Sequence, residues 1–93
     1  MNLEELDAVL GSEAVDELIE IYREDLAARL DQLRNATAPE EIRHHAHGLR
    51  SGAASFHATA LMDAARALET GSGSLAAVER AAAEVDAALA LRV

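Results

Sequence analysis

The sequence contains no cysteine and no tryptophan, and it has one proline, one tyrosine and one phenylalanine in 93 residues. Without cysteine, neither a disulfide framework nor a thiolate metal site is possible. Aromatic residues make up 2% of the chain although hydrophobic residues make up 51%, so we expect a core of alanine and aliphatic side chains. Because strands prefer aromatic and β-branched residues, their scarcity favours helices.

Positive charge is also scarce. The 8 basic residues are all arginine. The chain also has 17 acidic residues, so its formal net charge is −9. Such a chain repels nucleic acid and anionic membranes, so we expect neither as a partner. The first residues, MNLEELDAVL, lack the basic and then apolar pattern of a signal peptide, and no run approaches a membrane span. These features predict a cytoplasmic location.

Apolar residues recur at steps of three and four, the spacing of one face of a helix. We expect a first helix over 3–10, ended by Gly11, with Ser12 capping a second, long helix that frays near Asn35. The expected stripes are Leu3, Leu6, Val9 and Leu10 in the first helix, and Val15, Leu18, Ile19, Tyr22, Leu26, Leu30 and Leu33 in the second.

Three further helices follow. The third is expected to start at Thr37, because Thr37 and Glu40 have the spacing of a capping box and Pro39 is tolerated in a first turn. The fourth covers 58–70, and a Gly-Ser-Gly-Ser break at 71–74 precedes the fifth. Their stripes are Ile42, Ala46, Leu49, Ala53 and Phe56, then Leu61, Ala65 and Leu68, then Leu75, Val78, Ala82, Val85 and Leu89.

No repeat, long linker or strand pattern interrupts these segments. The sequence therefore predicts an all-α fold, an antiparallel four-helix bundle with a short N-terminal cap helix. Its length is that of one compact domain, which we expect to cover residues 1–93.

His47, in the third helix, is the candidate functional residue. At about 100° per residue it lies about 160° from Leu49 on the core stripe, so we expect it to be exposed. A neutral, exposed imidazole beside a cation suits reversible phosphoryl transfer between two proteins. Arg50, three residues on, supplies the cation, and Ser51, one turn on, is small enough for another protein to approach.

The surface around His47 is predicted to be partly basic and otherwise small. Gly48 and Gly52 cost helix stability, and we interpret them as room for a close approach. We expect His45 to flank the core stripe at a helix boundary and His57 to lie in a turn. The exposed arc around His47 is expected to hold Glu40, Arg43, His44, Arg50, Ser51 and Ala54.

These residues resemble a known family. The run HGLRSGA from His47 to Ala53, followed by Ala58, Leu61, Ala65 and Leu68-Glu69, is similar to the histidine phosphotransfer (HPt) domain of bacterial two-component phosphorelays. Residues 18–33 also resemble the second helix of that family, so the resemblance covers most of the chain. In two places the chain departs from the pattern: Ser51-Gly52 reverses the usual Gly-Ser order, and His57 stands where the family often has glycine.

The resemblance implies a function as a phosphorelay intermediate, with His47 as phosphoacceptor, Arg50 stabilising the phosphate and Ser51 as the small residue beside it. Arg43, His44, Gly48 and Ala54 are then expected on the docking face. The implied partners are a response-regulator receiver domain, a hybrid histidine kinase, or both. No cofactor is expected on this chain, because the receiver domain supplies Mg²⁺. We therefore expect a monomeric phosphocarrier without a nucleotide site, not an enzyme.

Three other classes of protein share features with this sequence. His44 and His47 have a spacing that helical metal sites use, but no cysteine or exposed carboxylate pair completes a tetrahedron. A non-catalytic helical adaptor, a degenerate HPt domain, typically loses the histidine or its basic neighbour, and this chain keeps both. The phosphoacceptor domain of a sensor kinase normally has an acidic residue after its histidine, whereas Gly48 follows here.

Overall fold

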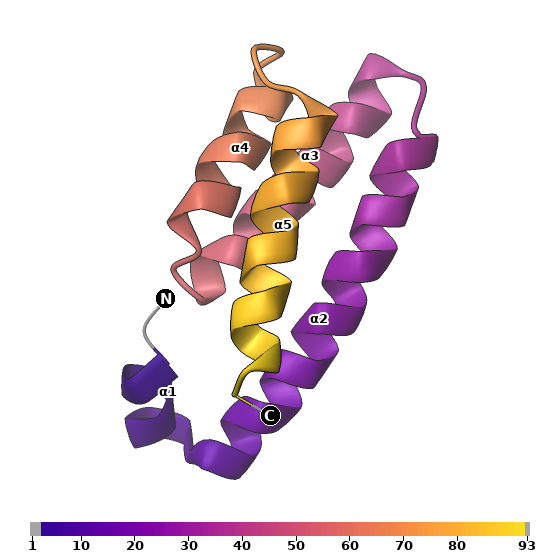
Figure 1. The fold of residues 1–93 in the computed structure, drawn as a ribbon. Helices are drawn as coiled ribbons and strands as arrows, with labels where there is room; N and C mark the ends of the chain where they lie inside the picture. The colour runs from indigo at the N-terminus through magenta and orange to yellow at the C-terminus, as the bar shows by residue number, and fades with distance from the viewer. Residues whose placement is uncertain (1–2, 93) are drawn as a thin grey trace.

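The chain folds into α-helices joined by short turns. The computed structural model describes residues 3–92, and within that range it contains five helices and no strand (Figure 1). The helices are α1 (Leu3–Leu10), α2 (Ser12–Asn35), α3 (Pro39–Ser55), α4 (Thr59–Glu69) and α5 (Leu75–Ala90). The all-α prediction is confirmed. None of the helices in the described range is both long and apolar enough to cross a membrane.

The helices lie alongside one another in a body of 40 × 19 × 18 Å. α3 packs against α2 on one flank and α4 on the other, α5 also contacts α2 and α4, and α1 packs against the start of α2 (Figure 1). The chain turns back at 36–38, 56–58 and 70–74. As a result α3, which carries the candidate histidine, has two flanks covered by neighbouring helices and one face open to solvent.

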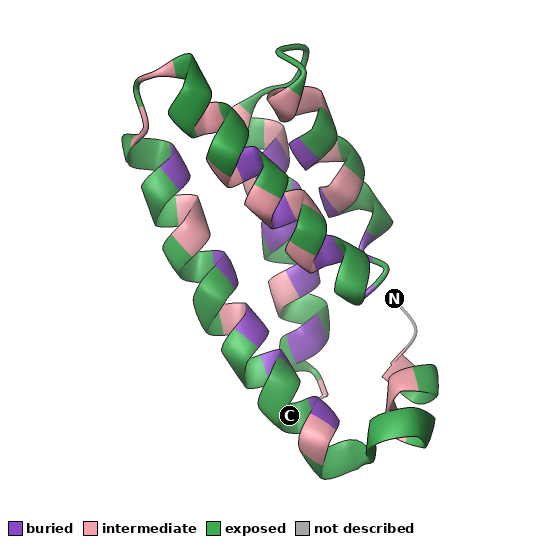
Figure 2. Ribbon diagram, turned by 180° about the vertical axis from the view of Figure 1, so that it is seen from behind, coloured by how far each residue is buried: buried purple, intermediate pink, exposed green. Residues whose placement is uncertain are grey.

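The core is aliphatic and rich in alanine, as the composition predicts. Figure 2 shows the buried positions in purple along the helices. Its buried members are Val15, Ile19, Tyr22, Leu26, Leu33, Ala46, Leu49, Ala53, Phe56, Ala58, Leu61, Ala65, Val78, Ala81, Ala82, Val85 and Leu89. Three predicted stripe residues are exposed instead: Val9, Leu10 and Leu18. α1 is short and contacts α2 alone among the helices, so only its Leu3 and Leu6 side reaches the core. Leu18 lies about 100° from Ile19, at the rim of the buried face of α2.

Two predicted helix caps are wrong. Gly11, at φ 86°, is the N-cap of α2, and Ser12 is already helical. Glycine adopts this left-handed conformation without steric cost, which allows α1 and α2 to join through one residue. Ala38 is the N-cap of α3 and provides no side-chain hydrogen bond. Pro39 is preorganised for the first helical position, so α3 starts too late for Thr37 to cap it.

Ion pairs link α2 to the end of the chain. Arg23 Nε lies 2.8 Å from Asp86 Oδ1, and Arg34 Nε lies 2.7 Å from Glu79 Oε1, so both pairs join α2 to α5. Arg92, just after α5, binds Asp7 of α1 and Asp16 of α2. The hydrogen bond from Arg92 lowers the pKa of the Asp7 carboxyl. The two ends of the described chain are thereby held together.

Candidate functional site

His47 lies on the open face of α3, and 59% of its side chain is exposed. Ala46, Leu49 and Ala53 occupy the opposite face of the same helix and are buried against the core. The helical spacing therefore predicts the direction of the imidazole correctly.

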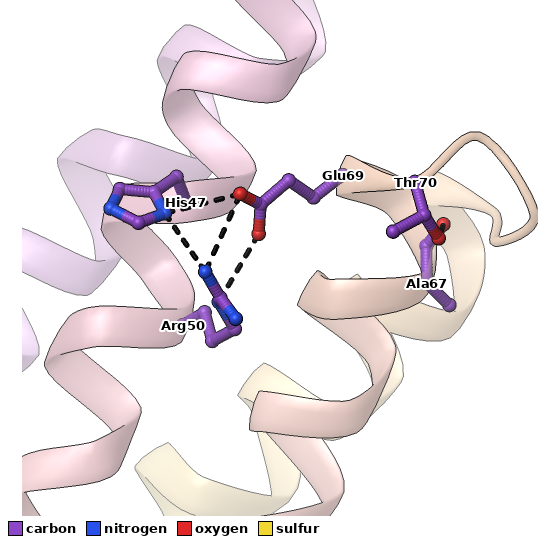
Figure 3. A network of polar contacts seen from close by, with 5 residues as sticks. All are labelled: His47, Arg50, Ala67, Glu69 and Thr70. Carbon is purple, nitrogen blue, oxygen red and sulfur yellow. Dashed lines mark hydrogen bonds and ion pairs between the residues drawn. The ribbon is translucent and has the colours of Figure 1, made fainter.

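On the α4 flank, His47 joins Arg50 and Glu69 in a polar cluster (Figure 3). Nδ1 of His47 lies 3.1 Å from Oε1 of Glu69 and 3.1 Å from Nη2 of Arg50. Arg50 also lies close to the carboxylate, with its Nε 3.1 Å from Oε2 and its Nη2 3.4 Å from Oε1. One carboxylate is thus shared by a guanidinium and an imidazole.

These contacts limit the proton positions on the ring. A guanidinium only donates and a carboxylate only accepts, so Nδ1 either donates its proton to Glu69 or accepts a hydrogen bond from Arg50. In the neutral ring with the proton on Nδ1, the lone pair is on Nε2. Nε2 points away from both Arg50 and Glu69 (Figure 3). The cluster can therefore hold the imidazole with its nucleophilic nitrogen directed outward, while the carboxylate faces the nitrogen that carries the proton.

Glu69 is the site residue that sequence reasoning missed. In the sequence, Glu69 stands out only as the end of the Leu68-Glu69 pair, to which no role is assigned. One signal for it existed, because Glu69 is the last residue of α4 and a carboxylate is unfavourable at the negative end of a helix dipole. Its contacts with His47 and Arg50 supply a reason for that placement. Arg50 is correspondingly less open than expected, with 33% of its side chain exposed.

On the α2 flank, large side chains fill the space that two glycines leave. A Cβ atom on Gly48 would lie 2.7 Å from Cζ of Arg29, and one on Gly52 would lie 3.1 Å from Cε1 of Tyr22. Both glycines therefore leave room for side chains of α2 from the same chain, and not for another protein. This packing fixes α3 against α2 behind the histidine.

Tyr22 forms the dry part of this flank. Its ring packs against Phe56, with centroids 4.7 Å apart, and its hydroxyl is buried without a hydrogen-bond partner. Burial, helped by the nearby Asp25 carboxylate, raises the pKa of Tyr22 to about 12. Because its hydroxyl is isolated from solvent, Tyr22 packs beside the site and takes no part in proton transfer.

The remaining histidines lie apart from the polar cluster. The ring of His44 is exposed and meets His45 edge-on, with centroids 5.3 Å apart. His45 is half-buried in the middle of α3, away from a helix boundary. His57 is exposed in the turn after α3, at φ 53°. Other residues expected around His47 are exposed on α3: Glu40, Arg43, Ser51 and Ala54.

Between residues 3 and 92, no three histidine, cysteine or acidic side chains are grouped so that they could hold a metal ion. In comparisons with known proteins, a family model described as the Hpt domain matches residues 17–91, a range that contains the whole polar cluster and both glycines. No curated protein and no solved structure gives a significant match.

Proposed function

The chain belongs to the Hpt domain family, and on that premise we propose that it carries a phosphoryl group on His47 to or from the aspartate of response-regulator receiver domains. Membership in the family itself indicates phosphotransfer in two-component signalling. The observation that supports the more specific proposal is the orientation of His47. Its Nδ1 faces Glu69 at 3.1 Å, while Nε2 points away from the cluster (Figure 3).

In the proposed reaction, the Nε2 lone pair attacks the phosphorus of an aspartyl phosphate in line. The bond from phosphorus to the aspartate oxygen breaks, and the carboxylate leaves with that electron pair. The imidazole gains positive charge in this step, and the Glu69 carboxylate stabilises it through the Nδ1 proton. Arg50 stabilises the charge on the phosphoryl oxygens, and the Mg²⁺ of the receiver domain does so from the partner side. The reverse sequence returns the group to an aspartate.

The other exposed residues of α3 take supporting roles in this proposal. Ser51, one turn from His47, is small and leaves the phosphoryl group accessible. The exposed residues Arg43, His44 and Ala54 contribute to the face on which a receiver domain or a hybrid histidine kinase docks, whereas Gly48 packs against Arg29 of α2. The chain acts as a carrier and as a substrate of its partners, without a nucleotide site, a cofactor or enzymatic activity of its own.

We further propose that residues 1–93 form one domain, in which α2 to α5 are an antiparallel four-helix bundle and α1 is a cap. A bundle of this size can fold as a monomer, and a bacterial cytoplasmic location fits partners of this kind. Sedimentation of the purified chain tests the monomeric state.

Incubation with a phosphorylated receiver domain tests the function. We expect the chain to acquire phosphate that is labile in acid and stable in base, as a phosphoramidate bond to histidine is. His47→Gln should abolish labelling, whereas His57→Gln, which changes an exposed histidine outside the cluster, should not. Circular dichroism of each variant checks the fold.

Full labelling of His47→Gln would refute the assignment. If the wild-type chain bound the phosphorylated receiver domain without taking up phosphate, the non-catalytic adaptor would be the correct function instead.

A further inference from the structure

Arg29 of α2 lies directly against α3 beside His47. Its Cζ, Nη1 and Nε atoms are 2.7, 2.9 and 3.0 Å from the point that a Cβ of residue 48 would occupy. Any side chain larger than glycine at that position would displace the guanidinium. Gly48 thus brings a cation from a second helix next to the phosphoacceptor's backbone.

Arg29 also differs from the other arginines of residues 3–92. Four of these, Arg23, Arg34, Arg50 and Arg92, form ion pairs with carboxylates. The other four make no hydrogen bond or ion pair within the described part of the chain; among them Arg43, Arg66 and Arg80 are exposed, and Arg29 is half-buried. A guanidinium that is partly removed from water and has no anion beside it retains its full capacity to bind one.

The position of Arg29 complements that of Arg50. On a helix with about 100° per residue, Gly48 lies about 100° to one side of His47, and Arg50 lies about 60° to the other side. Cations therefore flank His47 from α2 and from α3. The charge of Arg50 is already shared with Glu69, and Nε2 of His47 points away from that pair (Figure 3). A phosphoryl group on Nε2 brings up to two negative charges, which the Arg50–Glu69 pair alone does not balance.

We propose that Arg29 is a second ligand of the phosphoryl group on His47. When Nε2 carries the group, the Arg29 guanidinium swings away from Gly48 and donates N–H groups to the phosphoryl oxygens. Arg29 then stabilises the dianionic form of phosphohistidine. This inference rests on the proposed function, because it requires His47 to be the phosphoacceptor.

The test uses chemical phosphorylation, which needs no receiver domain. Phosphoramidate transfers its phosphoryl group to an exposed imidazole and releases ammonia, and the resonance lost in His47→Gln identifies phospho-His47 by ³¹P NMR. Titration of that resonance gives the pKa of the second phosphoryl ionisation. We expect Arg29→Gln to raise this pKa by about half a unit to one unit, because a nearby cation favours the dianion.

Arg80→Gln is the matched control, since it removes the same charge from an exposed position on α5, a helix that packs against α2 and α4. Its titration should stay within about a tenth of a unit of the wild type.

Two results would overturn the role of Arg29: equal titration curves for Arg29→Gln and wild type, or equal shifts in Arg29→Gln and Arg80→Gln. The second result would reduce the effect to net charge. Either can occur while His47 still accepts phosphate from a receiver domain, so failure of this inference is distinguishable from failure of the proposed function.

Discussion

The two flanks of α3 hold the histidine in different ways. On the α4 flank, polar side chains in contact with water make interactions that depend on where the imidazole proton lies, and even the most enclosed of them, Glu69, has 23% of its side chain exposed. On the α2 flank, Tyr22 is 9% exposed, and its ring packs against Gly52 through van der Waals contact alone. The α4 flank can respond to a change of charge on the imidazole, whereas the contact of Tyr22 with Gly52 on the α2 flank keeps α3 in place.

A reactive side chain on a small helical protein thus needs two kinds of neighbour, one that orients it and one that fixes its helix. A neutral imidazole needs a partner that selects one tautomer, and such a partner must be polar and close to water. The helix that carries it must nevertheless stay fixed against a neighbour, and the close packing of the Tyr22 ring against Gly52 achieves this without a hydrogen bond. Each of the following experiments acts on one flank and leaves the other unchanged.

The largest expected effect tests whether the α2 flank is dry. Tyr22 has a pKa of about 12 in the folded chain and about 10 when unfolded, so the folded state holds the proton more tightly. The stability that the protonated Tyr22 hydroxyl contributes is complete below pH 10 and is lost as pH rises from 10 towards 12. Two units correspond to about 2.7 kcal/mol of unfolding free energy. Urea denaturation across this pH range measures the loss, and the absence of lysine and cysteine leaves Tyr22 as the side chain that titrates there.

Tyr22→Phe is the control for this experiment. The hydroxyl is buried without a partner, so its removal should cost little stability at pH 8. The variant should then lose less stability than the wild type as pH rises. Parallel stability curves for the two proteins would mean that water reaches the Tyr22 hydroxyl and that the contrast between the flanks is false.

The next effect acts on the α4 flank. Glu69→Ala removes the acceptor of the Nδ1 proton, and a hydrogen bond to a charged group is worth about 1.5–3 kcal/mol. If the hydrogen bond between Nδ1 and Glu69 strengthens as the imidazole gains charge, its loss should lower the rate of phosphotransfer from a phosphorylated receiver domain about 10- to 100-fold. Glu69→Gln retains a carbonyl acceptor and should recover part of the rate. Rapid-quench measurement of phosphotransfer gives these values.

Glu84→Ala is the matched control, because Glu84 is an exposed acidic residue on α5. It should transfer phosphate at the wild-type rate. If Glu69→Ala changed the thermal stability but not the rate, Glu69 would be a structural contact between α3 and α4 and would not orient the imidazole.

The smallest effect compares the two glycines of the α2 flank. Replacing glycine by alanine inside a helix stabilises it by about 0.5–1 kcal/mol when nothing obstructs the new methyl group. At Gly48 the obstruction is the flexible end of Arg29, which can move aside, so Gly48→Ala should raise the melting temperature. At Gly52 it is the ring of Tyr22, held against Phe56, so Gly52→Ala should gain less or lose stability. Equal rises in the melting temperature of the two variants would show that neither Arg29 nor Tyr22 is held in place against α3.

Much of this molecule follows from local sequence. The periods of apolar residues predict all five helices, and the glycine and serine residues at 71–74 predict the turn before α5. The helix starts were less predictable: Ser12 and Thr37 have good capping chemistry, but Gly11 and Pro39 fix the backbone at these two junctions. Backbone restrictions of glycine and proline outweigh a single capping hydrogen bond, which contributes about 1 kcal/mol.

Residue spacing alone places His47 opposite the core face of α3 with Arg50 beside it, because spacing sets the angle of each side chain about its own helix axis. It does not reveal which side chains from other helices meet that face. Glu69 reaches Nδ1 from α4, and Arg29 and Tyr22 reach the glycines from α2, only through the packing of three helices. Spacing within one helix carries no information about the distance or rotation between helices, and tertiary packing supplies both.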